Sequence, residues 1–203
     1  MRIAVLVSGS GTNLQALIDA SKAGDLTPAQ LALVISNRPN VRAIRRAQDA
    51  AIPAQLIDHK DYASRRDFEE EMLQTLRSHD IEAIVLAGFM RILSPFFVGH
   101  FENRILNTHP ALCPAFPGIA APQQAIDAGV KVSGCTVHLV DSGVDTGPIV
   151  FQEAMPVQPD DTASSLHTRI QALEHRLLPL ATRYLAAGDL RVVGRQVRIH
   201  GVS

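Results

Sequence analysis

Residues 3–13, IAVLVSGSGTN, join a continuous apolar run to a turn rich in glycine and serine. The run Ile3–Val7 carries no polar residue, as expected of a central parallel strand that is buried on both faces. The turn Ser8–Asn13 precedes an amphipathic segment, which predicts a helix from about Leu14 to Lys22. A strand, a glycine-rich turn and a helix start, in this order, predict the first strand–helix unit of an α/β fold.

The same alternation of apolar strands and amphipathic helices continues through the first half of the chain. Because strand–helix–strand crossovers are right-handed, a doubly wound, mainly parallel sheet is the simplest arrangement. We interpret the charged run Glu69–Glu71 as the solvated side of the helix that is predicted at Ser64–His79. Strands are predicted at Leu31–Ile35, Ala54–Ile57, Ile84–Ala87 and Arg104–Leu106, and helices at Asn40–Ala51 and Ser64–His79.

The second half of the chain departs from this alternation. A strand at Val132–Val140 leads through the polar turn Asp141–Pro148 to a return strand at Ile149–Val157. Because no helix separates them, the two strands are expected to be antiparallel. We therefore predict an α/β fold, a doubly wound, mainly parallel, Rossmann-like sheet with an antiparallel C-terminal portion, in a single domain spanning 1–203. The remaining elements are a helix at Gln123–Ala128, a helix at Thr162–Ala187 that Pro179 should kink or divide, and a terminal hairpin at Arg191–Ile199.

Composition limits the classes of function. Of 203 residues, 46% are hydrophobic and 19% charged, which is typical of a globular protein, and the formal net charge is −1. This balance argues against a nucleic-acid scaffold or a membrane-surface binder, both of which need excess positive charge. No run approaches the roughly 20 apolar residues that span a bilayer. Because Cys113 and Cys135 show no metal-ligand spacing, we expect reduced thiols, no metal and a cytoplasmic location.

The glycine-rich turn indicates an anion site. Small residues let backbone N–H groups approach an anion, and a helix N-terminus attracts negative charge. A dinucleotide site is disfavoured because no third glycine follows Gly11 and because the second strand leads into Ser36–Arg38 without an acidic residue. No Lys-Ser/Thr pair follows the glycines, which argues against a nucleoside triphosphate. A phosphomonoester fits better, and a tight turn that binds nothing is the alternative.

A second stretch, Asn107-Thr108-His109-Pro110, follows the predicted strand Arg104–Leu106 and opens a segment with three prolines. Proline fixes φ and removes a backbone donor, so the segment predicts a stiff loop at a strand end. Asn107 and His109 are two positions apart and share a face if the strand continues. An amide beside an imidazole could stabilise an oxyanion, although a single histidine at a strand end is more often a structural residue.

Asp145 strengthens the catalytic interpretation, since it also follows a strand and precedes a rigid Gly-Pro segment. An aspartate beside a histidine orients the ring and stabilises its protonated form, which can then donate to developing negative charge. The sequence shows neither a serine nucleophile elbow nor zinc-type spacing. The three residues therefore favour direct acyl transfer to an amine over covalent or metal catalysis.

Four motifs together resemble one enzyme family. They are Ser8–Gln15, Leu86–Leu93, Asn107–Pro110 and Asp141–Pro148. In this order and at these intervals they closely resemble the phosphoribosylglycinamide formyltransferases (GAR transformylases) of purine biosynthesis. The His-Pro and Asp-x-Gly-Pro segments alone would indicate only the wider family of folate-dependent formyltransferases.

The resemblance implies a formyltransferase fold and a reaction in de novo purine (IMP) biosynthesis. The amine of N1-(5-phospho-D-ribosyl)glycinamide (glycinamide ribonucleotide, GAR) would attack the formyl carbon of the co-substrate 10-formyltetrahydrofolate and pass through a tetrahedral intermediate. His109 would be the general acid and oxyanion stabiliser, Asn107 the second donor, and Asp145 the group that keeps His109 protonated.

The resemblance also implies a division of the site. The part at about 1–100 would bind the phosphate, and the part at about 101–203 would carry catalysis and folate binding. Only small-molecule partners are expected, with no nucleic acid and no membrane, and a homodimer is left open. The implied substrate contacts are Gly11, Thr12, Asn13 and Glu174, and the implied folate contacts are Arg65, Met90, Arg91, Ile92, Leu93, Asn107, Asp141 and Val144.

The sequence departs from the family pattern at two positions, and two alternative functions are left open. Cys113 stands where the family commonly has leucine, and Ala120 where many members have histidine. Cys113 near the site suggests an enzyme sensitive to thiol reagents, and whether a Cys113–Cys135 disulfide forms is left open.

The first alternative is a formyltetrahydrofolate deformylase, which would use water as the acceptor. A non-catalytic nucleotide- or folate-binding module would need the glycine turn but not the paired His109 and Asp145.

Overall fold

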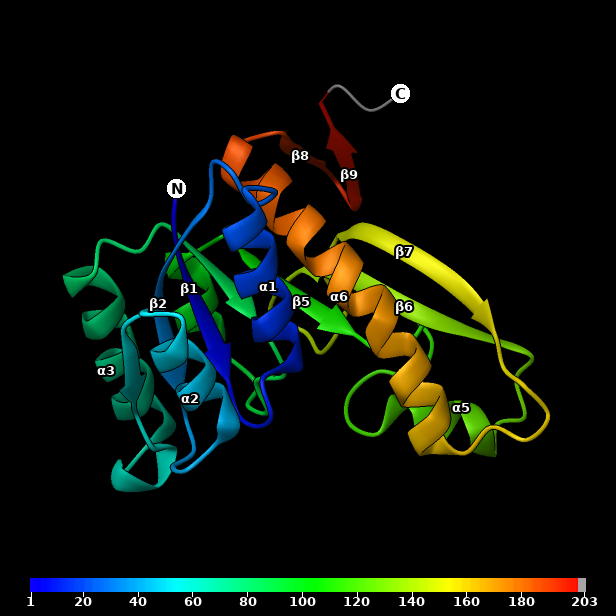
Figure 1. The fold of residues 1–203 in the computed structure, drawn as a ribbon. Helices are drawn as coiled ribbons and strands as arrows, with labels where there is room; N and C mark the ends of the chain where they lie inside the picture. Colours follow the sequence, from blue (N-terminus) through cyan, green and yellow to red (C-terminus); the bar gives the residue numbers. More distant parts are fainter. Residues whose placement is uncertain (201–203) are drawn as a thin grey trace.

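The computed structural model describes residues 1–200 and contains a nine-stranded sheet in the order β3-β2-β1-β4-β5-β6-β7-β9-β8 (Figure 1). Neighbouring strands from β3 to β5 are parallel, whereas β6 is antiparallel to both β5 and β7. The mainly parallel sheet with an antiparallel C-terminal portion is thus confirmed. The strands are β1 (Arg2–Val7), β2 (Gln30–Ser36), β3 (Ala54–Leu56), β4 (Ala83–Leu86), β5 (Ile105–His109), β6 (Val132–Leu139), β7 (Ile149–Pro156), β8 (Leu190–Val193) and β9 (Gln196–Ile199).

Helices cover both faces of the sheet. Helices α1, α2, α5 and α6 contribute to one apolar cluster, and α3 and α4 to a second cluster on the opposite face. The long helix α6 runs beside α1 across the first face (Figure 1). The helices are α1 (Thr12–Ala23), α2 (Arg42–Asp49), α3 (Arg65–Ser78), α4 (Pro95–His100), α5 (Ala121–Asp127) and α6 (Ala163–Ala187), with a 3₁₀ turn at His59–Asp61.

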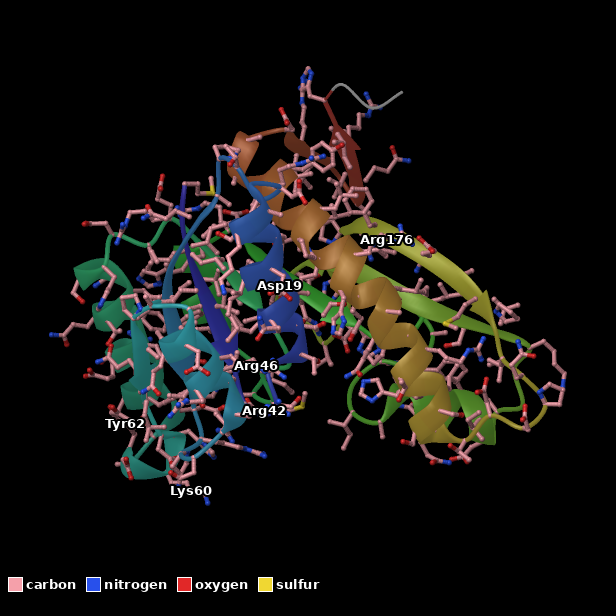
Figure 2. All side chains as sticks on the ribbon, in the orientation of Figure 1. Asp19, Arg42, Arg46, Lys60, Tyr62 and Arg176 are labelled. Carbon is pink, nitrogen blue, oxygen red and sulfur yellow. The ribbon has the colours of Figure 1, made fainter. Side chains whose placement is uncertain are left out.

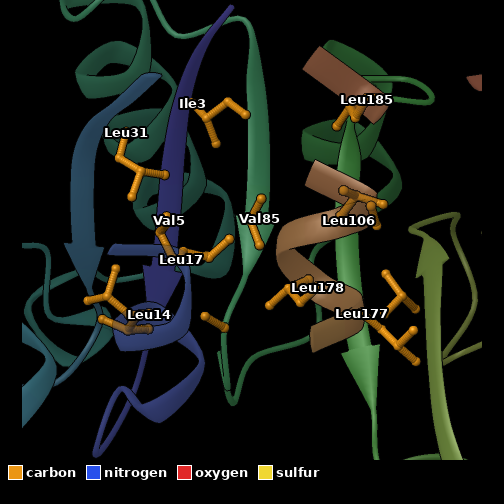
Figure 3. Close-up of a cluster of buried hydrophobic side chains, with 14 of the residues drawn as sticks. Ile3, Val5, Leu14, Leu17, Leu31, Val85, Leu106, Leu177, Leu178 and Leu185 are labelled. Carbon is orange, nitrogen blue, oxygen red and sulfur yellow. The ribbon is translucent and has the colours of Figure 1, made fainter. Parts of the chain in front are cut away.

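Strand β1 lies at the centre of the packing. Alternate residues point to opposite faces of a strand, so Ile3 and Val5 join the first cluster while Ala4 and Leu6 join the second. Figure 3 shows Val5 beside Leu17 of α1. Complete burial of such a side chain contributes about 1.5–3 kcal/mol. This two-sided burial explains the continuous apolar run and holds the end of β1 in a fixed position.

The C-terminal elements follow the sequence with one exception. Helix α6 continues through Pro179, so the expected division of this helix is wrong. Proline removes one hydrogen bond, but Leu177, Leu178 and Ala181 are buried around it, and their packing keeps the helix continuous. The terminal hairpin is confirmed, since β8 and β9 pair antiparallel, and β9 joins the edge of β7.

Two local features of the opposite face differ from the expectation. Helix α4 was not predicted, although Ser94 caps it by accepting from the Phe97 N–H and Pro95 occupies its first turn, a common helix start. Glu69 is buried, so its assignment to the solvated side of α3 is wrong. Within residues 1–200, no helix combines the length and apolar character that a membrane crossing requires.

Candidate active site

The glycine loop (residues 8–13) joins β1 to α1 at the carboxyl end of the parallel sheet. Gly11 has φ +72°, and a Cβ at this position would lie 2.7 Å from Cβ of Ala43 on α2. Glycine is therefore required both by the left-handed backbone and by the close approach of α2. No side chain caps α1. The first N–H groups of the helix thus remain available to an anion, with the helix dipole in support.

A buried carboxyl group connects the glycine loop to β5. Glu174 on α6 accepts from Asn13 Nδ2 at 3.2 Å and from Thr108 Oγ1 at 3.3 Å. Burial raises the pKa of Glu174, and these two hydrogen bonds offset only part of the effect. Among residues 1–200, Asn13 Oδ1 is buried without a hydrogen-bond partner. This oxygen could accept an N–H or O–H from a ligand.

Arg46 on α2 places a positive charge against the glycine loop. Its Nε donates to Ser10 O at 3.0 Å and its Nη1 to Gln15 Oε1 at 2.7 Å. Arg46 lies on the helix beside α1 (Figure 2). A groove of about 740 Å³ begins here and runs between α1 and α6, with Thr12 and His175 in its lining. Its lining does not include His109 or Asp145, so the groove meets the site only at the glycine loop.

The second part of the site is the His–Asp cluster (Asn107, His109, His138 and Asp145). Asn107 and His109 come from β5, and Asp145 from the loop after β6. His109 Nδ1 lies 3.3 Å from Asp145 Oδ2, and Asn107 Nδ2 donates to Asp145 Oδ1 at 3.2 Å. The structure therefore brings together the three residues that the sequence singles out. They meet at the carboxyl end of β5, where α/β sheets carry their ligands.

The ring of His109 has a polar contact at each of its two nitrogens. Nε2 lies 2.8 Å from Phe116 O, while Nδ1 faces the Asp145 carboxylate. A carbonyl oxygen and an ionised carboxylate can only accept hydrogen bonds. Both ring nitrogens of the buried His109 thus face hydrogen-bond acceptors, which fix the orientation of the ring.

Asp145 remains ionised in this setting. Burial alone would raise its pKa, but hydrogen bonds from His138 and from the Gly118 N–H, together with the charge of His109, outweigh burial and lower the pKa. The Gly118 N–H donates to Asp145 Oδ2 at 2.8 Å. Asp145 has φ +54°, an uncommon conformation for a residue with a side chain. The loop therefore holds this carboxylate in a strained but well-bonded position.

His138 belongs to the cluster although the sequence indicates only an inward-facing residue near the site. It is the antiparallel partner of Asn107 in the β5–β6 pair. Its Nε2 lies 3.2 Å from Asn107 Nδ2 and 3.5 Å from Asp145 Oδ1, and its Nδ1 lies 2.9 Å from Leu139 O. The alternating pattern of β6 marks His138 as inward-facing. Only the strand register shows that it meets Asn107.

The loop between β6 and β7 is shaped by its own polar groups. Asp141 Oδ1 accepts from the Gly143 N–H at 3.0 Å and from Thr146 Oγ1 at 2.7 Å. A Cβ on Gly147 would lie 1.7 Å from Leu139 O, so only glycine fits there. Val144 is exposed at the tip of the loop. The Asp-x-Gly-Pro motif is thus a backbone requirement that places Asp145 against His109.

The segment after β4 presents apolar side chains beside the glycine loop. Met90 and Ile92 are 58% and 61% exposed. The Met90 N–H donates to Ser8 Oγ at 2.8 Å, and Arg65 Nη2 donates to Ile92 O. The structure therefore places Arg65 against the segment 90–93. Leu93 differs, because its side chain is buried in the second apolar cluster.

Comparison with known proteins assigns the chain to a family. The sequence profile described as "Formyl transferase" matches residues 1–182. The chain is 40% identical to the phosphoribosylglycinamide formyltransferase of Haemophilus influenzae, over 94% of this chain and 90% of that protein. The chain belongs to the phosphoribosylglycinamide formyltransferases of the formyl transferase family.

Solved structures of this family have the same fold. The structure of glycinamide ribonucleotide transformylase 1 from Symbiobacterium toebii superposes with a TM-score of 0.95 at 47% identity, covering 98% of this chain and 93% of that one. The chain is also 48% identical to the "Trifunctional purine biosynthetic protein adenosine-3" of Drosophila melanogaster over 92% of its own length. It spans only 14% of that longer relative.

The two cysteines are free thiols, and both are buried. Burial raises the pKa of Cys113, and it raises that of Cys135 to about 12. Thiols react as thiolates, so the buried Cys113 is a poor target for thiol reagents despite its place near the cluster.

Among residues 1–200, no group of three or more His, Cys, Asp or Glu side chains could hold a metal ion. Ala120 has φ +55° and is the residue before α5.

Proposed function

We propose that this chain transfers the formyl group of 10-formyltetrahydrofolate to the amine of GAR in purine biosynthesis. The observation that carries the proposal is His109, whose two ring nitrogens both face acceptors and whose Nδ1 meets the Asp145 carboxylate. A cationic imidazole beside an amide suits an acyl transfer in which negative charge develops on oxygen. The similarity to phosphoribosylglycinamide formyltransferases supports the same reaction.

In the proposed reaction the GAR amine adds to the formyl carbon to give a tetrahedral intermediate, which collapses when the C–N10 bond of the folate breaks. The amine loses a proton and N10 gains one, so the exchange is balanced. His109 Nε2–H donates to the formyl oxygen, which replaces Phe116 O as its acceptor. Asn107 supplies the second donor by exchanging its His138 contact for the same oxygen. As the general acid, His109 passes its proton to the leaving N10 and regains one from the GAR amine, and Asp145 favours the protonated ring.

The glycine loop supplies the phosphate site in this proposal. Backbone N–H groups of Gly11, Thr12 and Asn13 bind the phosphate at the N-terminus of α1. The charge of Arg46 lies close enough to favour the same anion. Glu174 contacts the sugar part of GAR, supported by its position beside Asn13 and Thr108.

The folate lies on the other side of the His–Asp cluster in this proposal. The exposed side chains of Met90 and Ile92 cover the pterin, and Arg65 meets the carboxylate-bearing end. Arg91 and Val144 are also exposed and complete the contacts. Asp141 and Leu93 act through their backbone, because the Asp141 carboxylate bonds within its loop and Leu93 is buried.

We also propose that residues 1–203 act as one domain. The part at about 1–100 contributes the phosphate site, and the part at about 101–203 contributes catalysis and much of the folate site. The contact of Glu174 with both Asn13 and Thr108 supports this joint action. The cytoplasmic location stays a prediction, and the formation of a homodimer stays an open question.

An activity assay tests the function. Purified protein should produce the absorbance change of the folate only when 10-formyltetrahydrofolate and GAR are both present. Binding of either compound without turnover would favour the non-catalytic module. The second candidate is the deformylase, whose support is a structural match of TM-score 0.87 at 25% identity to the formyltetrahydrofolate deformylase of Burkholderia mallei, covering 98% of this chain and 69% of that one. Turnover of the folate without GAR would favour it.

A further inference from the structure

Glu69 is a buried acid that the proposed reaction does not use. It lies on α3 and is 1% exposed, although the two residues that follow it, Glu70 and Glu71, are also acidic. A buried carboxylate is costly unless several donors compensate its charge. The side chain of the next residue, Glu70, is 53% exposed and pairs with Arg66 at the surface. The two adjacent acids therefore have different surroundings, and only Glu69 requires a structural explanation.

Three donors surround the Glu69 carboxylate. Oε1 accepts from the Ser94 N–H at 2.8 Å and from Arg65 Nε at 3.1 Å, while Oε2 accepts from Ser94 Oγ. Arg65 lies one turn earlier on α3, whereas Ser94 caps α4. One carboxylate thus joins the first turn of α3 to the start of α4. Hydrogen bonds to a charged group are among the stronger ones in proteins.

These contacts fix the irregular segment between β4 and α4. At its start the Met90 N–H donates to Ser8 Oγ, and at its end Ser94 is bonded to Glu69. Between these points Arg65 Nη2 donates to Ile92 O. The segment contains no helix or strand, so its conformation depends on these bonds and on the buried side chains of Phe89 and Leu93. Because Met90 and Ile92 are largely exposed, no packing of their side chains holds the backbone in place.

Glu69 also orients the guanidinium of Arg65. The Nε contact and the Nη2 contact to Ile92 O hold the plane of the group from two sides. Nη1 has no hydrogen-bond partner among residues 1–200, and the side chain is 45% exposed. A guanidinium held in this way can present Nη1 to an external carboxylate with little loss of conformational entropy.

We infer that Glu69 is a positioning residue for the folate, acting through Arg65 and through the segment 90–94. The inference rests on the proposed function, which places the folate on Arg65 and on this segment. Glu69 does not touch the reacting atoms, so its loss should weaken folate binding and leave the chemical step and the phosphate site unchanged. A role in general stability alone would not separate the two substrates.

The test is Glu69→Gln, which keeps the size of the side chain but removes its charge and turns an N–H₂ group toward a donor. In a steady-state assay with both substrates, we expect KM for 10-formyltetrahydrofolate to rise about tenfold. The values of kcat and of KM for GAR should stay within about twofold. Glu70→Gln is the matched control, one residue along the same helix, and should leave all three constants unchanged.

The alternatives are distinguishable. A fall in kcat with an unchanged folate KM, or equal effects on both substrates, would overturn the inference. If Glu69→Gln does not fold, as judged by circular dichroism, Ser94→Ala replaces it, and an unchanged folate KM in that variant overturns the inference. If the wild-type protein shows no turnover, the proposed function fails. Titration with tetrahydrofolate then decides, since weaker binding by Glu69→Gln than by Glu70→Gln supports the role of Glu69 and equal or undetectable binding refutes it.

Discussion

In the proposed function the glycine loop and the His–Asp cluster form the two ends of one site, but they are built from different parts of the chain. The loop offers backbone N–H groups whose positions depend on Gly11 and on the start of α1. The cluster offers buried side chains whose positions depend on one another through Asp145. A side-chain substitution leaves the backbone N–H groups of the loop in place. A substitution in the cluster removes one of the groups that hold the others. Substitutions in the loop should therefore affect binding, and substitutions in the cluster should affect the chemical step.

The strongest test of this difference is His109→Ala. The substitution removes the proposed cationic donor, whose ring lies between the Asp145 carboxylate and Phe116 O. A general acid contributes about 10²–10⁴ in rate, so kcat should fall by a factor in this range while KM for GAR changes little. Steady-state kinetics measure both constants. A variant that loses GAR affinity with kcat preserved would show that the two ends of the site are not separate.

Asp145→Asn should produce the next largest effect. The amide keeps the shape but not the charge that holds His109 protonated, and kcat should fall by about 10²–10³. The pKa of Asp145 is lowered from 3.8 in the folded protein. Its charge therefore contributes stability above about pH 4 that is lost as pH falls through the lowered folded pKa. Urea unfolding should show the stability difference between wild type and variant at pH 6, and the difference should shrink near pH 3.

Gly11→Ala tests the loop through its backbone. The new Cβ meets Ala43 at 2.7 Å in a residue with φ +72°, and the combined strain should cost about 1–3 kcal/mol of unfolding free energy. Gly24→Ala is the matched control, because Gly24 has φ +83° but nothing within 4 Å of the added atom. Denaturant unfolding compares the two variants. Equal losses would mean that the contact with α2 does not constrain the loop.

Thr12→Ala should have a smaller effect. Thr12 lies at the start of α1, where its N–H is retained and only the hydroxyl is lost. We expect KM for the phosphorylated substrate to rise several-fold, as the loss of one hydrogen bond of about 1 kcal/mol predicts. The value of kcat should not change. A pure kcat effect would place the phosphate elsewhere.

Alkylation of Cys113 should have the smallest effect of all. The thiol is buried and its pKa is raised, so brief treatment with iodoacetamide at pH 7 should leave both the thiol and the activity intact. Mass spectrometry follows the modification, and the assay follows the activity. Rapid modification with loss of activity would restore the thiol sensitivity suggested by the sequence and would show that the cluster opens to solvent.

The sequence predicts those features that depend on local pattern. The run Ile3–Val7 with its glycine turn indicates the central strand and the start of α1, and the spacing of Asn107 and His109 indicates a shared face. Features that depend on long-range packing are missed. His138 enters the cluster because β6 pairs with β5 in one register, and Glu69 is buried because α4 begins beside it. The continuity of α6 through Pro179 depends on the sheet beneath it.

The contacts of Glu174 have a consequence for how binding at one end of the proposed site affects binding at the other. One carboxyl group is shared by Asn13, on the side of the glycine loop, and by Thr108, which lies between Asn107 and His109. Thermodynamic linkage is reciprocal. If a ligand at the glycine loop changes the affinity of the His109 strand for a second ligand, that second ligand must change the affinity of the loop by the same factor.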